Sequence, residues 1–138
     1  MRKLILITFL AAVAAFAQNA SPSKAKKLTV AEFDNLVSHP DQVLLLDVRR
    51  PDEITSNGGF AVYLSIQAAD LEKHLSEIPK DRMIVTVSNH ANRASQAADM
   101  LIGKGFKVAG AVGAQTYEEE GGKLVKKIQP PKQSPDKK

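Results

Sequence analysis

The chain has 138 residues, which allows one domain with a single hydrophobic core and excludes a second domain. Its formal net charge is +4, but the charge is unevenly distributed. Residues 28–122 hold eight Lys or Arg against fourteen Asp or Glu and are acidic, whereas residues 123–138 hold six Lys against one Asp and are basic. Nucleic-acid-binding proteins usually carry basic residues on the folded face that contacts phosphate, so we expect no nucleic-acid binding.

Residues 1–17 predict a cleavable signal peptide. Arg2 and Lys3 precede an apolar run from Leu4 to Phe16, and the small residues at its end fit cleavage after Ala17. The thirteen residues of this run fall short of the ~20 that span a bilayer, so an uncleaved membrane anchor is the less favoured alternative. We expect a periplasmic or secreted protein with no stable membrane insertion after cleavage.

The sequence contains no cysteine. A disulfide framework and thiolate metal ligands are therefore excluded, and the stability of the domain must come from its core. The histidines His39, His74 and His90 show no ligand spacing with one another or with paired carboxylates. We expect neither a structural metal ion nor a cofactor.

Residues 18–27 are rich in Ser, Ala, Pro and Lys, a composition typical of a linker. Thr29 and Glu32 then match a capping box, which predicts a first helix that ends near Pro40. Further on, the apolar spacing and the turn residues predict the following elements: a strand at 63–66, a helix at 70–78, a helix from about 93 to 104, a strand at 106–112 and a short helix at 115–120. Residues 129–138 read as a disordered basic tail.

Two continuous apolar runs predict the central strands. One lies in Gln42–Val48 and the other is Met83–Val87. Parallel strands are buried on both faces and therefore read as unbroken apolar runs, and their carboxyl ends form the edge at which open α/β sheets bind ligands. Asp47 and the loop Ser88–Arg93 should both lie at that edge.

The segment Ile84–Ser95 resembles the active-site segment of single-domain rhodaneses (thiosulfate sulfurtransferases). In that family a strand is followed by a cysteine, four loop residues, an arginine and a helix. In this alignment the sulfur-carrying cysteine falls on Ser88, the loop glycine on Ala91 and the arginine on Arg93. The resemblance extends over residues 28–128 and implies an α/β rhodanese-like domain, with a central, mostly parallel five-stranded sheet flanked by helices on both faces.

Asp47-Val48-Arg49, followed by Pro51 and Glu53, is similar to the Asp-Val-Arg signature of the same family. There the aspartate and the arginine are mainly structural, which implies a scaffold role for Asp47 and Arg49. Residues 58–67 keep the family's spacing but not its letters, so the loop geometry beside the active site should differ.

The predicted site is an anion-binding loop. Backbone N–H groups, the start of the following helix and Arg93 would together attract an anion. Arg93 has an alternative role in an ion pair with the acidic body of the domain, for example with Asp47. A glycine at position 91 would allow a positive φ, whereas Ala91 would be strained there, by on the order of 1 kcal/mol. The predicted binding residues are Ser88, Asn89, His90, Ala91, Asn92 and Arg93.

The missing cysteine decides the expected function. Sulfur transfer in the family runs through a cysteine persulfide, and a serine hydroxyl cannot carry the sulfur in this way. We therefore expect no sulfurtransferase activity, and binding of a small oxyanion or an exported protein partner through the loop. Two alternatives stay open: a hydrolytic or sulfurtransferase-like enzyme that uses Ser88 with His90 as the base, and a structural partner-binding module without a small ligand.

Overall fold

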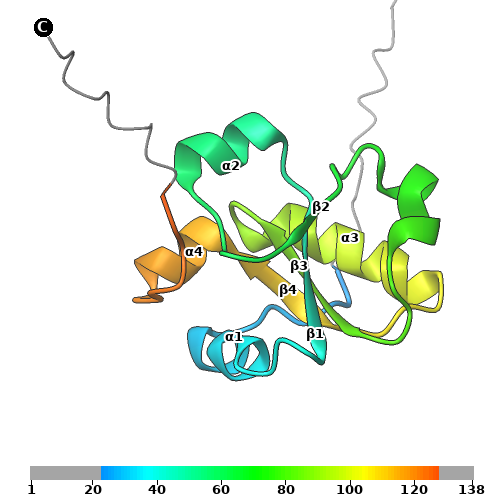
Figure 1. Ribbon diagram of the computed structural model, residues 1–138, viewed down its shortest axis with the longest axis horizontal. Coiled ribbons are helices and arrows are strands. Elements are labelled where there is room, and N and C mark those ends of the chain that lie inside the picture. Colours follow the sequence, from blue (N-terminus) through cyan, green and yellow to red (C-terminus); the bar gives the residue numbers. More distant parts are fainter. Residues whose placement is uncertain (1–22, 128–138) are drawn as a thin grey trace, which may run out of the picture.

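The computed structural model describes residues 23–127 (Figure 1). The predicted signal peptide, residues 18–22 of the predicted linker and the predicted tail at 129–138 lie outside the described residues. Within 23–127, no helix has both the length and the apolar character needed to cross a membrane.

A parallel sheet forms the centre of the domain. Its strands are β1 (Val43–Asp47), β2 (Leu64–Ser65), β3 (Met83–Ser88) and β4 (Val108–Gly113), and their order across the sheet is β2-β1-β3-β4. All three strand pairs are parallel, which confirms the predicted α/β class. The prediction of five strands was wrong, since the described residues form four.

The segment before α1 makes one bridge to the sheet instead of a fifth strand. Lys27 forms a bridge with Ala111 of β4, on the side of β4 that faces away from β3, and the N–H of Ala111 donates to the carbonyl of Lys26 at 2.8 Å. Just upstream, the N–H groups of Lys24 and Ala25 donate to the carboxylate of Asp99 at 3.1 and 2.8 Å. Because these N–H groups bond to the helix that carries Asp99, they cannot continue a ladder along β4.

In the described part of the chain, four α-helices and one 3-10 helix surround the sheet: α1 (Val30–Val37), α2 (Pro51–Asn57), η1 (Leu71–Glu77), α3 (Ala91–Gly103) and α4 (Ala114–Glu119). The capping box at the start of α1 is confirmed, with Glu32 N–H donating to Thr29 Oγ1 at 3.3 Å and Thr29 N–H to Glu32 Oε2 at 3.0 Å. The helix predicted over 70–78 is the 3-10 helix η1, interrupted by a non-helical backbone at His74.

Helix α2 was not predicted. Its sequence nevertheless carries the usual signals of a helix start, with Pro51 at the first position and Asp52 and Glu53 in the first turn. Helix α3 begins at Ala91, two residues before the predicted start.

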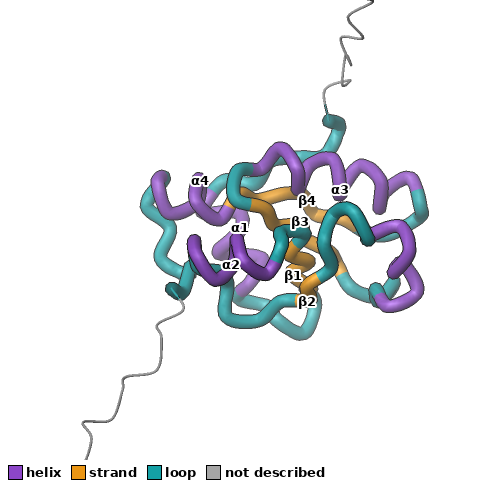
Figure 2. Tube along the Cα trace, turned by 90° about the horizontal axis from the view of Figure 1, so that it is seen from above, coloured by secondary structure: helices purple, strands orange, loops and turns teal. Residues whose placement is uncertain are grey.

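Helices lie on both sides of the sheet (Figure 2), and the core of the described part of the chain consists of two apolar clusters, one on each face. Leu46 and Ile84 point to the face covered by α3, where they pack with Leu101. Leu45 and Val85, their neighbours in sequence, point to the face covered by α1 and α4. This alternation is what a strand's period of two requires, and it confirms that helices flank both faces.

A buried ion pair lies where β1 ends. The side chains of Asp47 and Arg49 are 1% and 0% exposed, and Arg49 Nη2 lies 2.7 Å from Asp47 Oδ2. The N–H of Arg49 also donates to Asp47 Oδ1 at 3.0 Å, and Arg49 Nη1 donates to the carbonyl of Gly58, at the end of α2, at 3.0 Å. These contacts join β1 to α2, and the scaffold role implied for both residues stays a prediction.

Replacing Asp47 should therefore destabilise the domain strongly. We expect Asp47→Asn to lower the free energy of unfolding by roughly 3–5 kcal/mol, because Arg49 would stay buried without a counter-charge. Urea denaturation at pH 7 measures the change. The matched control is Asp52→Asn, which removes a similar pair with Arg50 that lies on the surface and should change little. Equal losses in the two variants would contradict this role.

Candidate functional site

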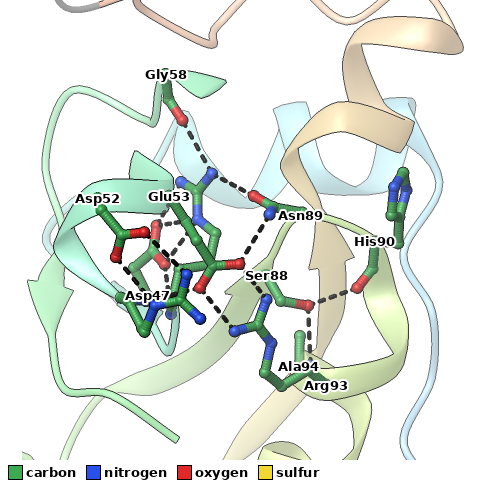
Figure 3. Close-up of polar contacts among 11 residues, drawn as sticks. Asp47, Asp52, Glu53, Gly58, Ser88, Asn89, His90, Arg93 and Ala94 are labelled. Carbon is green, nitrogen blue, oxygen red and sulfur yellow. Dashed lines mark hydrogen bonds and ion pairs between the residues drawn. The ribbon is translucent and has the colours of Figure 1, made fainter. Parts of the chain in front are cut away.

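Ser88 ends β3 at the carboxyl edge of the sheet, where the sequence places it. Its side chain is buried, and both hydrogen-bonding functions of the hydroxyl are used inside the loop. Ser88 Oγ donates to the carbonyl of His90 at 2.6 Å and accepts the N–H of Ala94 at 3.0 Å. The hydroxyl therefore fastens the loop to the first turn of α3 (Figure 3).

Asn89 links a cation to an anion. Its Oδ1 accepts from Arg49 Nη1 at 2.9 Å, and its Nδ2 donates to Glu53 Oε1 at 3.0 Å. Only one orientation of the amide satisfies both contacts, because the guanidinium can only donate and the carboxylate can only accept. Asn89 thereby connects the buried Asp47–Arg49 pair to the outer part of the site.

Glu53 lies between Asn89 and Arg93, as Figure 3 shows. Arg93 Nη1 and Nη2 lie 2.8 and 2.7 Å from the two carboxylate oxygens of Glu53, a bidentate pair. Glu53 Oε2 also accepts the N–H of Arg50 at 3.0 Å and so caps the start of α2. The Glu53 side chain is 14% exposed and that of Arg93 36%, so the pair lies at the rim of the site.

This environment strongly favours the charged form of Glu53. The hydrogen bond from Arg93 is the largest cause and lowers the pKa of Glu53 to about 2, and the N–H of Arg50 adds to it against the opposing effect of burial. In turn, the hydrogen bond to Glu53 raises the pKa of Arg93 above its ordinary value. Both partners are thus fully charged at neutral pH.

The other loop residues point elsewhere. The ring of His90 is exposed, with Nδ1 3.3 Å from Thr116 Oγ1, and Figure 3 shows it turned away from Ser88. Asn92 Oδ1 accepts from Lys27 Nζ at 3.0 Å. Ala91 is the first residue of α3, and because glycines alone have a positive φ among residues 23–127, it carries none of the strain expected for it.

The structure decides the partner of Arg93. Of the two alternatives, the ion pair with the acidic body is present, but the partner is Glu53, whereas Asp47 pairs with Arg49.

Sequence reasoning treated Glu53 only as part of the Asp-Val-Arg signature and missed its role in the site. The helix-start pattern Pro51-Asp52-Glu53 was the available signal, because it places a carboxylate in the first turn of a helix beside the loop. Anion binding by the loop stays a prediction.

No group of three or more His, Cys, Asp or Glu side chains within residues 23–127 is arranged to hold a metal ion. The charged side chains of Asp47, Arg49, Glu53 and Arg93 are instead joined in two ion pairs.

The pKa of Glu53 predicts a pH-dependent contribution to stability. Since the folded-state pKa of about 2 lies below the ordinary 4.5, the pair should stabilise the fold above about pH 5, and this contribution should disappear as the pH falls toward 2. At pH 7 we expect Glu53→Gln to lower the free energy of unfolding by up to about 3 kcal/mol. Urea denaturation of both proteins between pH 7 and pH 2 should show this difference shrinking. A difference that does not change with pH would contradict the assignment.

Comparison with known proteins finds matches in structure. No protein-family model matches the chain, and no curated protein matches it in sequence. A rhodanese-related protein from Thermoplasma volcanium matches with a TM-score of 0.62 and 25% identity, over 72% of this chain and 97% of that one. A rhodanese-like domain protein from Staphylococcus aureus has a TM-score of 0.62 and 18% identity, over 75% of this chain and 99% of that one.

A thiosulfate sulfurtransferase from Pseudomonas aeruginosa has a TM-score of 0.61 and 22% identity, over 76% of this chain but 21% of that one. The matches below 25% identity show a shared fold alone. The match to the Thermoplasma protein spans nearly its whole length, and it agrees with the family resemblance found in the motifs around Asp47 and Ser88. The chain therefore has the fold of rhodanese-like proteins, and its sequence contains no cysteine.

Proposed function

We propose that this rhodanese-like domain has no sulfurtransferase activity and binds an anionic group at the loop of residues 88–93. The anion is a small oxyanion or a carboxylate of a protein partner. The apolar leader at residues 1–17 supports export, which would make the partner a periplasmic or extracellular protein.

The absence of persulfide chemistry follows from the side chain at position 88. A serine hydroxyl is a poor nucleophile without an activating base, and the two hydrogen bonds of Ser88 Oγ go to the backbone of His90 and Ala94. The ring of His90, the base of the hydrolytic alternative, bonds to Thr116 instead. These contacts favour binding over catalysis.

The observation that carries the proposal is the bound carboxylate of Glu53. Arg93 and Asn89 supply three hydrogen bonds to it, so the loop already holds an anion that belongs to the same chain. An external anion would take the place of this carboxylate on Arg93. Exchange of this kind predicts weak binding in the wild type, because the internal carboxylate competes at an effectively high local concentration.

Glu53→Gln should therefore strengthen anion binding. Removing the internal charge leaves Arg93 free for an incoming anion, and we expect the Kd for sulfate or thiosulfate to fall about tenfold or more, a change that corresponds to about 1.4 kcal/mol. Calorimetric titration of sulfate, thiosulfate, sulfite, phosphate and acetate measures the affinities. Arg93→Gln should abolish the gain when combined with Glu53→Gln.

The matched control is again Asp52→Asn. It removes a neighbouring carboxylate in the same turn of α2, and because Asp52 pairs with Arg50 and not with Arg93, the anion affinity should change little. Equal gains in Asp52→Asn and Glu53→Gln would indicate a general charge effect. The proposal would fail in that case, and also if none of these anions binds to Glu53→Gln.

Sulfur transfer provides a separate test. Wild-type protein mixed with thiosulfate and cyanide should form no thiocyanate above the no-enzyme blank, because the chain has no thiol to carry the sulfur.

Ser88→Cys would place a thiol where the N–H of Ala94 and the start of α3 favour a thiolate. We expect activity in Ser88→Cys and more in Ser88→Cys/Glu53→Gln, in which Arg93 is free to bind thiosulfate. Thiocyanate formation by the wild type above the blank would contradict the proposal, whether or not it survives Ser88→Ala.

A further inference from the structure

A second surface lies at the opposite end of β1 from the Ser88 loop. It is an apolar groove of about 310 Å³ bounded by α1, the first half of β1, residues 60–63 and residues 124–126. Phe33 and Phe60 line it, with ring centroids 4.6 Å apart. On its rim Val62 is 82% exposed and Leu124 38%. Ligand pockets have volumes of roughly 300–1,000 Å³, so the groove can hold at least one large side chain.

The groove also contains part of a free strand edge. β1 pairs with β3 along all of Val43–Asp47, but β2 pairs with β1 only at Leu46 and Asp47. On the β2 side, residues 43–45 therefore have no strand partner among the described residues, and all three line the groove. A free strand edge carries main-chain N–H and C=O groups to which another extended chain can bond.

Two cations complete the surface. Arg82 and Lys126 line the groove and are exposed. Within residues 23–127 neither side chain takes part in an ion pair, whereas Arg49, Arg50 and Arg93 all do. An apolar groove flanked by two such cations is complementary to a ligand that has both apolar and anionic groups.

We propose that the groove binds an extended segment of another protein by strand addition to β1. The segment places a large apolar side chain against Phe33 and Phe60 and a carboxylate side chain near Arg82 or Lys126. An aliphatic carboxylate such as a fatty acid would match the apolar lining and the cations but would leave the backbone of residues 43–45 unpaired. An extended acidic peptide matches all three features, and we therefore favour it.

Selection from a library of random heptapeptides displayed on phage tests the proposal. With the purified protein as the target, we expect enrichment of peptides that contain a large apolar residue and at least one Asp or Glu. The best synthetic peptide is then titrated by fluorescence anisotropy. Arg82→Glu/Lys126→Glu should raise its Kd about tenfold or more, and Val62→Asp should also raise it, because both variants bring negative charge to the groove.

The side chains of Arg82, Lys126 and Val62 are exposed, so these variants should fold, and circular dichroism verifies that they do. Lys107→Glu is the matched control, since it reverses an exposed charge that does not line the groove, and it should leave the Kd unchanged. A peptide N-methylated at alternate amides should lose about tenfold in affinity, because the methyl groups block hydrogen bonding to the strand edge.

Several results would overturn the proposal. They are the absence of enriched peptides, equal binding to the charge-reversed variant and the wild type, and equal binding of the methylated and unmethylated peptides. Dodecanoate is titrated in parallel. Binding of dodecanoate without any peptide binding would assign the groove to a small amphiphile and would also overturn the proposal. None of these outcomes depends on anion binding at residues 88–93.

Discussion

The buried guanidinium of Arg49 is the contact on which the carboxyl edge of the sheet depends. It lies between the carboxylate of Asp47, the carbonyl of Gly58 and the amide of Asn89, so that one side chain joins β1, the end of α2 and the loop after β3. A charge that is fully buried is tolerated only when it is paired and hydrogen-bonded. The positions of α2 and of the loop are therefore coupled to the same ion pair.

Much of the fold could be predicted from sequence patterns. The continuous apolar runs around Leu45 and Val85 identified central parallel strands, because burial on both faces leaves few other residue types possible. The capping box of Thr29 and Glu32 located the start of α1 to the residue. The fifth strand was implied by the family resemblance and was not assigned to any residues, and the linker before α1 makes only an isolated bridge, from Lys27 to Ala111, among the described residues.

The sequence allowed the position of the candidate site to be predicted, but not the contacts among its side chains. The alignment on Ser88 and the position of the loop at the strand ends followed from spacing, but pairing between charged side chains did not. Arg93 had several acidic residues within plausible reach, and the sequence gives no distance by which to choose among them. The choice of Glu53 depends on α2, a seven-residue helix whose start signals are short and whose apolar pattern is weak.

The two surfaces that we propose as binding sites use the same strand at different ends. At its carboxyl end β1 delivers Asp47 to a network in which the charged groups satisfy one another. At its amino end the strand lacks a partner on one side and borders apolar side chains with two unpaired cations among the described residues. Under our proposals, the first surface would bind a ligand by exchange with Glu53, whereas the second would bind one by addition to the strand edge.

Glu53 makes two structural contacts through the same carboxylate. The same carboxylate that neutralises Arg93 also closes the first turn of α2 through the N–H of Arg50. An anion that displaced this carboxylate from Arg93 would free the Glu53 side chain and would change the setting of the hydrogen bond that caps this turn. If the loop binds an anion as we propose, that binding would be coupled to the order of the first turn of α2 around Arg50.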